Sequence, residues 1–214
     1  MPSLLQIEVS PSGEQSVSRA ISAEFVAAWK EANPEGQITT RDLDANPVPH
    51  LDGEAIAAAW SPAESHTEGM KAKVQFRNGL VDEVEAADEL LISTPMWNYS
   101  VPSVLKAWID QLIDNERFNT STGTGLAGKK VTFVSAQGGS YKEGAPRHGW
   151  DYQTDYLLLF ARSLGATDVE VVHAEFTLAG IAPGMEDLVG LKDASIAAAK
   201  DAARARAAGS PSLA

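Results

Sequence analysis

The sequence predicts an α/β fold in which a doubly wound sheet of five parallel strands carries helices on both faces. Short apolar runs alternate five times with longer segments whose apolar residues recur at helical spacing. This alternation, without an internal repeat, is typical of an open parallel sheet that is covered on both sides. Ligands of such sheets bind outside the carboxyl ends of the strands, where the strand order reverses. We therefore expect a site in the loops that follow the strands.

The expected strands and helices follow one another along the chain. After the first strand, Ile21, Phe25 and Trp29 keep the spacing of one helix face. Pro102 suits the first turn of a helix, and Gly165 suits the end of one. The strands are expected at residues 4–9, 37–43, 89–94, 130–135 and 168–173. The helices are expected at residues 17–29, 54–60, 67–86, 102–112 and 152–164, and from about Met185 to Arg206.

Residues 1–208 are expected to form a single domain, and residues 209–214 a flexible tail. α/β folds commonly reach a length of 214 residues as one unit, and a hydrophobic fraction of 44% is enough for a sizeable core. The small and polar residues at positions 209–212 have the composition of a frayed end.

Composition and charge argue against several classes of function. The chain has no cysteine, which excludes disulfides, thiolate nucleophiles and cysteine metal sites. A net charge of −12 and the lack of a basic run argue against nucleic acid and anionic membranes as partners. The four histidines lack metal-binding spacing, so no metal is expected. No segment is long enough to span a bilayer, and the start lacks the basic region of a secretory signal, so a cytoplasmic protein is expected.

The loop after the first expected strand gathers hydroxyl groups where a helix begins. It contains Ser10, Ser12, Gly13, Ser16 and Ser18. Unpaired N–H groups and the positive end of the dipole favour an anion at a helix N-terminus, and serine hydroxyls add donors. The dinucleotide glycine fingerprint and the Walker lysine are both missing, so a phosphomonoester is the anion that suits this loop. The alternative is that Ser16 or Ser18 only caps the helix.

The loop after the third expected strand is apolar where small polar turn residues are usual. It reads Pro95, Met96, Trp97, Asn98, Tyr99. Exposed aromatic side chains at the carboxyl edge are unfavourable unless a flat apolar group covers them, and a tricyclic isoalloxazine has that shape. Backbone N–H groups of the loop, together with Asn98, would then meet the carbonyls and N5 of the ring. The alternative is that Trp97 and Tyr99 pack into the core or a second subunit.

The loop after the fourth expected strand contains a pair of glycines. It reads Ser135, Ala136, Gln137, Gly138, Gly139. Paired glycines allow a close approach of the backbone to a ligand or a positive φ, although a Gly-Gly turn alone is weak evidence. The three loops together are more informative, because they border one crevice of a doubly wound sheet.

On these residues the chain resembles the FMN-dependent NADH-azoreductase and quinone reductase family of flavodoxin-like enzymes, over nearly its whole length. The most specific part of the resemblance is Met96 to Tyr99. The other matching segments are Ser10, Ser16-Val17-Ser18, Arg41-Asp42-Leu43, Asn46-Pro47, Leu51-Asp52-Gly53-Glu54 and Gly138-Gly139. Two residues depart from the family pattern: Gln137 stands where a basic residue is frequent, and Trp60 where some members have arginine. The choice between NADH and NADPH therefore stays open.

The resemblance implies how the residues of the three loops bind the cofactor FMN. Ser10 and Ser16, Val17 and Ser18 would hold its phosphate and ribityl tail. The flavin ring would lie against Pro95 and the segment Met96, Trp97, Asn98, Tyr99. Its pyrimidine edge would lie against Ser135, Ala136, Gln137, Gly138 and Gly139. Tyr141, just past Gly139, is a candidate further donor to that edge, and the alternative for it is an ordinary packing role. Family members are typically homodimers that share the substrate site between subunits.

The implied reaction is a ping-pong reduction of quinones or azo compounds. NADH or NADPH delivers hydride to flavin N5, and an electron-poor aromatic acceptor then takes the electrons, so no catalytic side chain is required. Trp60 and Phe118 are candidate walls of the acceptor site, although core or dimer packing is the more common role of such residues.

Three other functions are compatible with the sequence. An electron-carrying flavodoxin would bind FMN, but the extra length between the second and third strands argues against it. A binding protein that has lost the cofactor shares the fold, since fold does not fix function. A specialised biosynthetic flavin reductase that acts on one natural product would carry the same loops.

Overall fold

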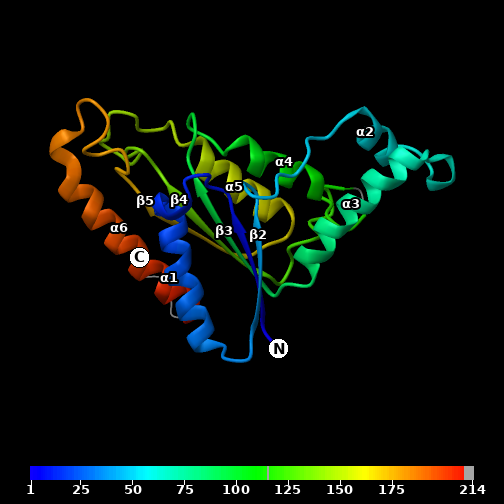
Figure 1. Cartoon of the computed structure of the whole chain (residues 1–214), viewed down its shortest axis with the longest axis horizontal. Helices are drawn as coiled ribbons and strands as arrows, with labels where there is room; N and C mark the ends of the chain where they lie inside the picture. The colour runs from blue at the N-terminus through cyan, green and yellow to red at the C-terminus, as the bar shows by residue number, and fades with distance from the viewer. Residues whose placement is uncertain (115, 210–214) are drawn as a thin grey trace.

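The computed structural model, which describes residues 1–114 and 116–209, contains one sheet of five parallel strands in the order β2-β1-β3-β4-β5 (Figure 1). The strands are β1 (Ser3–Glu8), β2 (Gln37–Asp42), β3 (Glu89–Pro95), β4 (Lys130–Ala136) and β5 (Asp168–Ala174). All five lie where the sequence predicts them, with ends that differ by one residue. Residues 210–214 of the expected tail lie outside the described residues.

Helices cover both faces of the sheet. They are α1 (Val17–Ala32), α2 (Gly53–Ala59), α3 (Glu68–Glu85), α4 (Ser103–Leu112), α5 (Tyr152–Ser163) and α6 (Val189–Ala207). In Figure 1, α1 and α6 lie side by side on one face, and α3, α4 and α5 lie on the other. The predicted doubly wound, flavodoxin-like arrangement is thereby confirmed.

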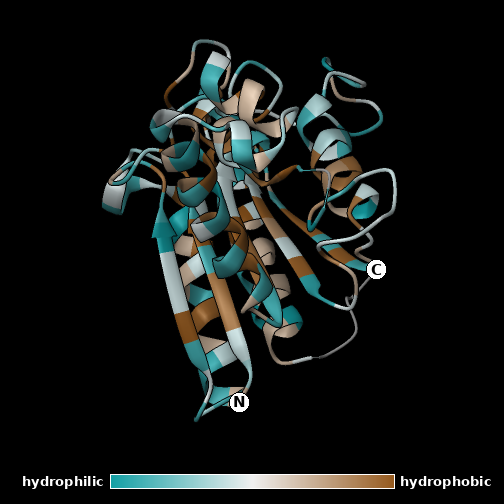
Figure 2. Ribbon diagram, turned by 90° about the vertical axis from the view of Figure 1, so that its right-hand side faces the viewer, coloured by the Kyte–Doolittle hydropathy of each residue, from teal (hydrophilic) through white to brown (hydrophobic). Residues whose placement is uncertain are grey.

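Side-chain alternation along the strands explains why both faces are apolar. Leu4 and Leu91 pack with the helices α1 and α6, whereas Leu5 and Leu90 pack with the opposite layer. Successive side chains of a strand point to opposite faces, so a strand that is buried on both faces needs a continuous apolar run. Figure 2 shows hydrophobic segments along the strands, between the two helical layers.

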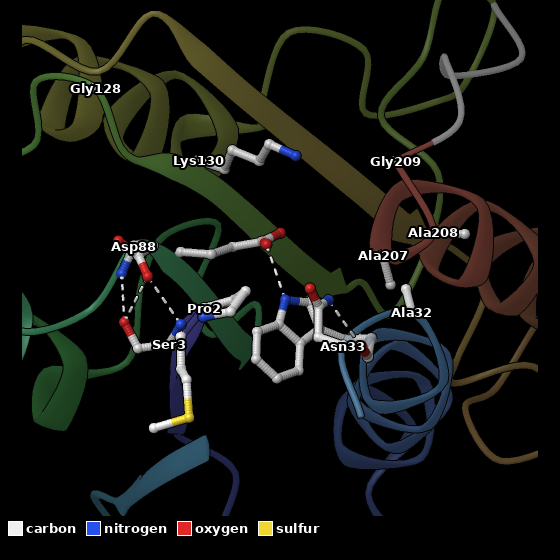
Figure 3. A pocket seen from close by; sticks show the side chains of 13 residues that line it. Pro2, Ser3, Ala32, Asn33, Asp88, Gly128, Lys130, Ala207, Ala208 and Gly209 are labelled. Atoms are coloured by element: carbon white, nitrogen blue, oxygen red, sulfur yellow. Dashed lines mark hydrogen bonds between the residues drawn. The ribbon is translucent and has the colours of Figure 1, made fainter. Parts of the chain in front are cut away.

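A buried acid lies at the amino edge of the sheet, opposite the strand ends where a site is expected. The indole N–H of Trp29 donates to Glu89 Oε2 at 3.0 Å, and the Glu89 side chain is almost fully buried. Both residues line an open depression of about 660 Å³. Figure 3 shows Ser3 and Asp88 bonded to each other in this depression, with Lys130 nearby. Burial raises the pKa of Glu89 above its ordinary value of 4.5. This effect outweighs the hydrogen bond from Trp29 and the nearby charges of Lys130 and Arg206, which lower the pKa.

Glu89→Gln is expected to stabilise the protein at neutral and alkaline pH. A raised pKa means that the folded state favours the protonated acid, so the cost of the buried charge is absent below pH 4.5 and is fully present above the raised pKa. Glutamine removes this cost and keeps an oxygen for Trp29. Urea unfolding at a series of pH values should show an advantage of the variant that grows with pH. An advantage that is equal at all pH values would contradict the assignment. The exposed Glu68→Gln serves as a control and should change the free energy of unfolding by less than about 0.5 kcal/mol.

Candidate functional site

Parallel pairing brings the three predicted loops to the same edge of the sheet. β1 pairs with β3, and β3 pairs with β4, so their carboxyl ends lie side by side at the upper edge in Figure 1. The ladder continues into the loops: Val9 N–H donates to Ser93 O at 3.1 Å, and Met96 N–H donates to Ala136 O at 2.8 Å. The predicted convergence of the loops is therefore a property of the fold.

The first loop offers hydroxyls and unpaired N–H groups at the start of α1. Ser10, Ser16 and Ser18 are almost fully buried. Ser16 caps the helix, because its Oγ accepts the N–H of Arg19 at 3.3 Å, and its hydroxyl also lies 3.2 Å from that of Ser18. Within residues 1–114 and 116–209, no acceptor takes the N–H groups of Val17 and Ser18. The loop therefore contains both a helix cap and free donors, while the Val17 side chain packs on the core.

The second loop is a two-residue turn with strained backbone. Trp97 and Ser100 exchange two backbone hydrogen bonds of 3.0 Å. Between them, Asn98 and Tyr99 both have positive φ, at 49° and 67°. Such a turn matches type I′, which asparagine tolerates and tyrosine rarely adopts. Trp97 is 44% exposed, and no acceptor in the described part of the chain takes the N–H groups of Asn98 and Tyr99. The turn thus presents two donors beside an exposed indole.

The segment between β4 and α5 covers this turn. The ring of Tyr99 meets Trp150 edge-on at 5.3 Å and Tyr141 edge-on at 6.2 Å. The Arg147 guanidinium lies 5.9 Å from the centre of the same ring, and the N–H of Tyr152 donates to Tyr99 O at 3.1 Å. Burial raises the pKa of Tyr141, so its hydroxyl stays a donor over a wide pH range.

The third loop differs from the prediction in one respect, namely which of its polar atoms are free to bind a ligand. The Ser135 hydroxyl donates to Gln153 Oε1 at 2.5 Å, and the Gln137 amide donates to Asp151 Oδ2 at 2.8 Å. Both side chains therefore face protein. The backbone of Gln137 is also bonded, because its N–H donates to Ala174 O at 2.7 Å and its carbonyl accepts the N–H of Thr177 at 3.0 Å. Ala136 lies at the last position of β4 and is buried.

The glycine pair of this loop has neither of the positive φ values that such a pair permits. A Cβ at Gly138 would lie 2.7 Å from the end of the Leu178 side chain, which would have to move, whereas a Cβ at Gly139 would meet open space. In the described residues, no acceptor takes the N–H groups of Gly138 and Gly139. The contribution of the loop to a site is thus its backbone.

Two predicted acceptor-site residues lie away from these loops. Phe118 is fully buried in the core and packs closely on Gly125, so the prediction that it forms a wall of the acceptor site is wrong for this chain. A buried aromatic cannot be told from a site aromatic by sequence spacing alone. Trp60 ends α2 and is 79% exposed. It borders a shallow depression with Ile113 and Asp114 rather than the three loops.

Several residues of the site were not identified from the sequence. Gln153 is fully buried in the first turn of α5 and connects two loops: its amide donates to Pro95 O at 2.8 Å and Ser100 O at 3.3 Å, and its oxygen accepts from Ser135. Arg19 bonds to Ser10 and Asp42 beneath the first loop. The sequence signal for Gln153 is a polar residue on the same helix face as the apolar residues Leu157 and Phe160.

Within the described ranges, no group of three or more His, Asp or Glu residues is placed to hold a metal ion. In the same part of the chain, no helix has the length and apolar character needed to cross a bilayer.

Comparison with known proteins gives matches over nearly the whole chain. The family model described as flavodoxin-like fold matches residues 2–207. A protein of Frankia alni named FMN-dependent NADH:quinone oxidoreductase is 45% identical over 210 residues, which cover 97% of this chain and 100% of that protein. A protein of the same name from Nostoc sp. is 41% identical over 199 residues, which cover 91% and 96%.

Solved structures share the fold at lower identity. The crystal structure of an azoreductase from Bacillus anthracis str. Sterne has a TM-score of 0.84 at 23% identity and covers 98% of this chain and 100% of that chain. An FMN-dependent NADH-azoreductase from Bacillus anthracis str. Ames Ancestor, solved in complex with FMN, has a TM-score of 0.80 at 22% identity, with coverages of 97% and 100%. At these identities the likeness concerns the fold.

Gln153→Leu is expected to lower the free energy of unfolding by about 2–4 kcal/mol, because it leaves the Ser135 hydroxyl unpaired in the core and takes a donor from Pro95 and Ser100. Urea unfolding measures this loss. The matched control is Gln75→Leu, an exposed glutamine of α3, with an expected change below about 0.5 kcal/mol. Equal effects of the two substitutions would show that Gln153 does not hold the loops.

Proposed function

Because this chain belongs to the flavodoxin-like family of FMN-dependent NADH:quinone oxidoreductases, we propose that it is an FMN-dependent enzyme that oxidises NADH or NADPH and reduces quinones, azo compounds or both. The observation that carries this proposal is the 45% identity to a protein of that name over 97% of this chain and 100% of that protein. The geometry of the three loops supports it.

The first loop suits the phosphate of FMN. A chain of net charge −12 disfavours an anion at long range, so a phosphate needs oriented local donors. The N–H groups of Val17 and Ser18 and the hydroxyls of Ser16 and Ser18 are such donors at the positive end of a helix. Ser10 completes this part of the proposed site.

The second and third loops suit the flavin ring. Met96 and the exposed Trp97 offer apolar surface to a flat ring, and the free N–H groups of Asn98 and Tyr99 offer donors to its polar atoms. For the pyrimidine edge we propose the backbone between Ala136 and Gly139, with the Tyr141 hydroxyl as a further donor. The side chains of Ser135 and Gln137 do not take part directly, because they bond to α5 and its cap.

When bound, FMN supplies a ring that takes up hydride from the nicotinamide and passes electrons to the acceptor. The protein positions the two partners and shields the reaction from water. No side chain of the three loops is needed as a nucleophile or a general base. We propose a ping-pong order, in which donor and acceptor use the same exposed face in turn.

The proposed assembly is a homodimer in the cytoplasm, the compartment that supplies NADH and NADPH. Exposed apolar side chains of α2, among them Ile56 and Trp60, are free to face a second subunit. Trp60 would then reach the acceptor site of the partner rather than its own.

Purified protein that is supplied with FMN should be yellow, lose that colour with NADH under anaerobic conditions, and regain it with a quinone or an azo dye. Initial rates at varied donor and acceptor should give parallel lines in double-reciprocal plots. Failure to take up FMN would contradict the proposal as a whole. Bleaching by NADH without reoxidation by either acceptor would leave a flavoprotein of another acceptor class, such as an electron carrier or a specialised biosynthetic reductase.

Ser18→Ala should raise the dissociation constant for FMN about 10-fold, because it removes a buried hydroxyl that the site offers to the phosphate. Fluorescence titration of the apoprotein with FMN measures this dissociation constant. Ser18 does not cap α1, so the free energy of unfolding of the apoprotein should change by less than about 1 kcal/mol. Ser163→Ala removes a serine hydroxyl from the far end of α5 and is the control. Unchanged affinity of the Ser18 variant would exclude its hydroxyl from the site.

A further inference from the structure

Arg19 lies beneath the first loop and connects it to β2. Its Nε and Nη2 atoms donate to the carbonyl oxygen of Ser10 at 2.9 and 2.7 Å. Its Nη1 and Nη2 atoms donate to the two carboxylate oxygens of Asp42 at 2.8 and 2.9 Å. Four of the five donors of the guanidinium are therefore used within the protein.

The carbonyl group that Arg19 binds belongs to the peptide bond that precedes a proline. The next residue is Pro11, which has no N–H. The peptide group between Ser10 and Pro11 therefore offers only an acceptor. A carbonyl oxygen that faced a phosphate would repel it, so a loop that binds an anion must turn this group away.

The charge of Arg19 is balanced where it lies. The bond to Asp42 raises the pKa of Arg19 and lowers the pKa of Asp42, and Glu8 lies 4.0 Å from Arg19 Nε. Glu8 is itself buried and accepts hydrogen bonds from Gln6, Ser22 and Ser93. Arg19 thus has no uncompensated charge to offer to a ligand.

We propose that Arg19 is a positioning residue for phosphate binding: it holds the Ser10 carbonyl against its guanidinium, and Asp42 holds the guanidinium in place. The loop then presents N–H groups and hydroxyls to the anion without an opposing carbonyl. This inference rests on the proposed binding of FMN.

A rival role gives the opposite result at Asp42. If Arg19 left Asp42 to bind the phosphate itself, loss of the Asp42 carboxylate would release the guanidinium and tighten FMN binding. In the positioning role, the same change weakens FMN binding, because Arg19 loses its support.

The test compares FMN with riboflavin, which has the same ring and lacks the phosphate. Apoprotein is titrated with each flavin, and fluorescence quenching gives the two dissociation constants. Arg19→Ala should weaken FMN binding about 10- to 100-fold and change riboflavin binding less than about threefold, since a bond to a charged group is lost from the phosphate loop alone. Arg19→Lys, whose single ammonium cannot bridge both acceptors, should recover part of the loss. The control Arg204→Ala removes an exposed arginine that pairs with Glu24 and should leave both constants unchanged.

Asp42→Asn and Asp44→Asn form a matched pair, because each removes one negative charge, either from the last residue of β2 or from the turn that follows it. Asparagine at position 42 keeps the oxygen that accepts the N–H groups of Asp44 and Ala45, and it loses the carboxylate that pairs with Arg19. Asp42→Asn should weaken FMN binding relative to Asp44→Asn, with riboflavin binding unchanged in both.

Three results would overturn the proposal. Equal losses for FMN and riboflavin in Arg19→Ala would show a general role in packing, and circular dichroism of each variant checks its folding. Tighter FMN binding in Asp42→Asn than in Asp44→Asn would show Arg19 to be a direct ligand. No effect of Arg19→Ala on either flavin would show that the contact is idle. Failure of the proposed function is recognised separately, because the unsubstituted protein would then bind no flavin.

Discussion

Parallel pairing of β1 with β3, and of β3 with β4, places three loops of different sequence at one edge of the sheet, because every strand runs in the same direction. The central strands are buried on both faces, which fixes their register and hence the height at which each loop leaves the sheet. A loop that started one residue later would turn its first side chain to the other face. The composition of the proposed flavin site therefore depends on the core beneath it.

Buried and half-buried polar side chains also fix the loops, beyond the backbone bonds of Val9 and Met96 that extend the ladder into them. Gln153 ties the turn after β3 to the end of β4, and Arg19 ties the loop after β1 to β2. Each group would carry a cost if it lost its partners in the interior. The side chains of Gln153 and Arg19, which complete hydrogen bonds beneath the loops, thus also hold the donors of the proposed site in place.

The sequence predicted the order of the elements well, because continuous apolar runs and helical spacing report burial directly. It also located the three loops. The sequence did not show whether a loop residue would offer its side chain or its backbone to a ligand. Ser135 and Gln137 occur in the predicted loop, yet their polar side-chain groups bond to α5 and its N-cap. Phe118 was misassigned because apolarity does not distinguish a core from a site wall. The turn at Asn98 and Tyr99 lacks the usual Asn-Gly signal, and its cover by Trp150 depends on a contact between distant segments.

The positive φ values of Asn98 and Tyr99 bear on how substitutions among relatives should be interpreted. Glycine, asparagine and aspartate adopt this conformation at small cost, whereas valine and isoleucine are excluded by their branched Cβ whatever they would contact. A narrow choice of residues at these two positions would follow from the backbone alone. Conservation of Asn98 and Tyr99 among relatives would therefore indicate first that the shape of the turn is kept, and contact with a cofactor only through that shape.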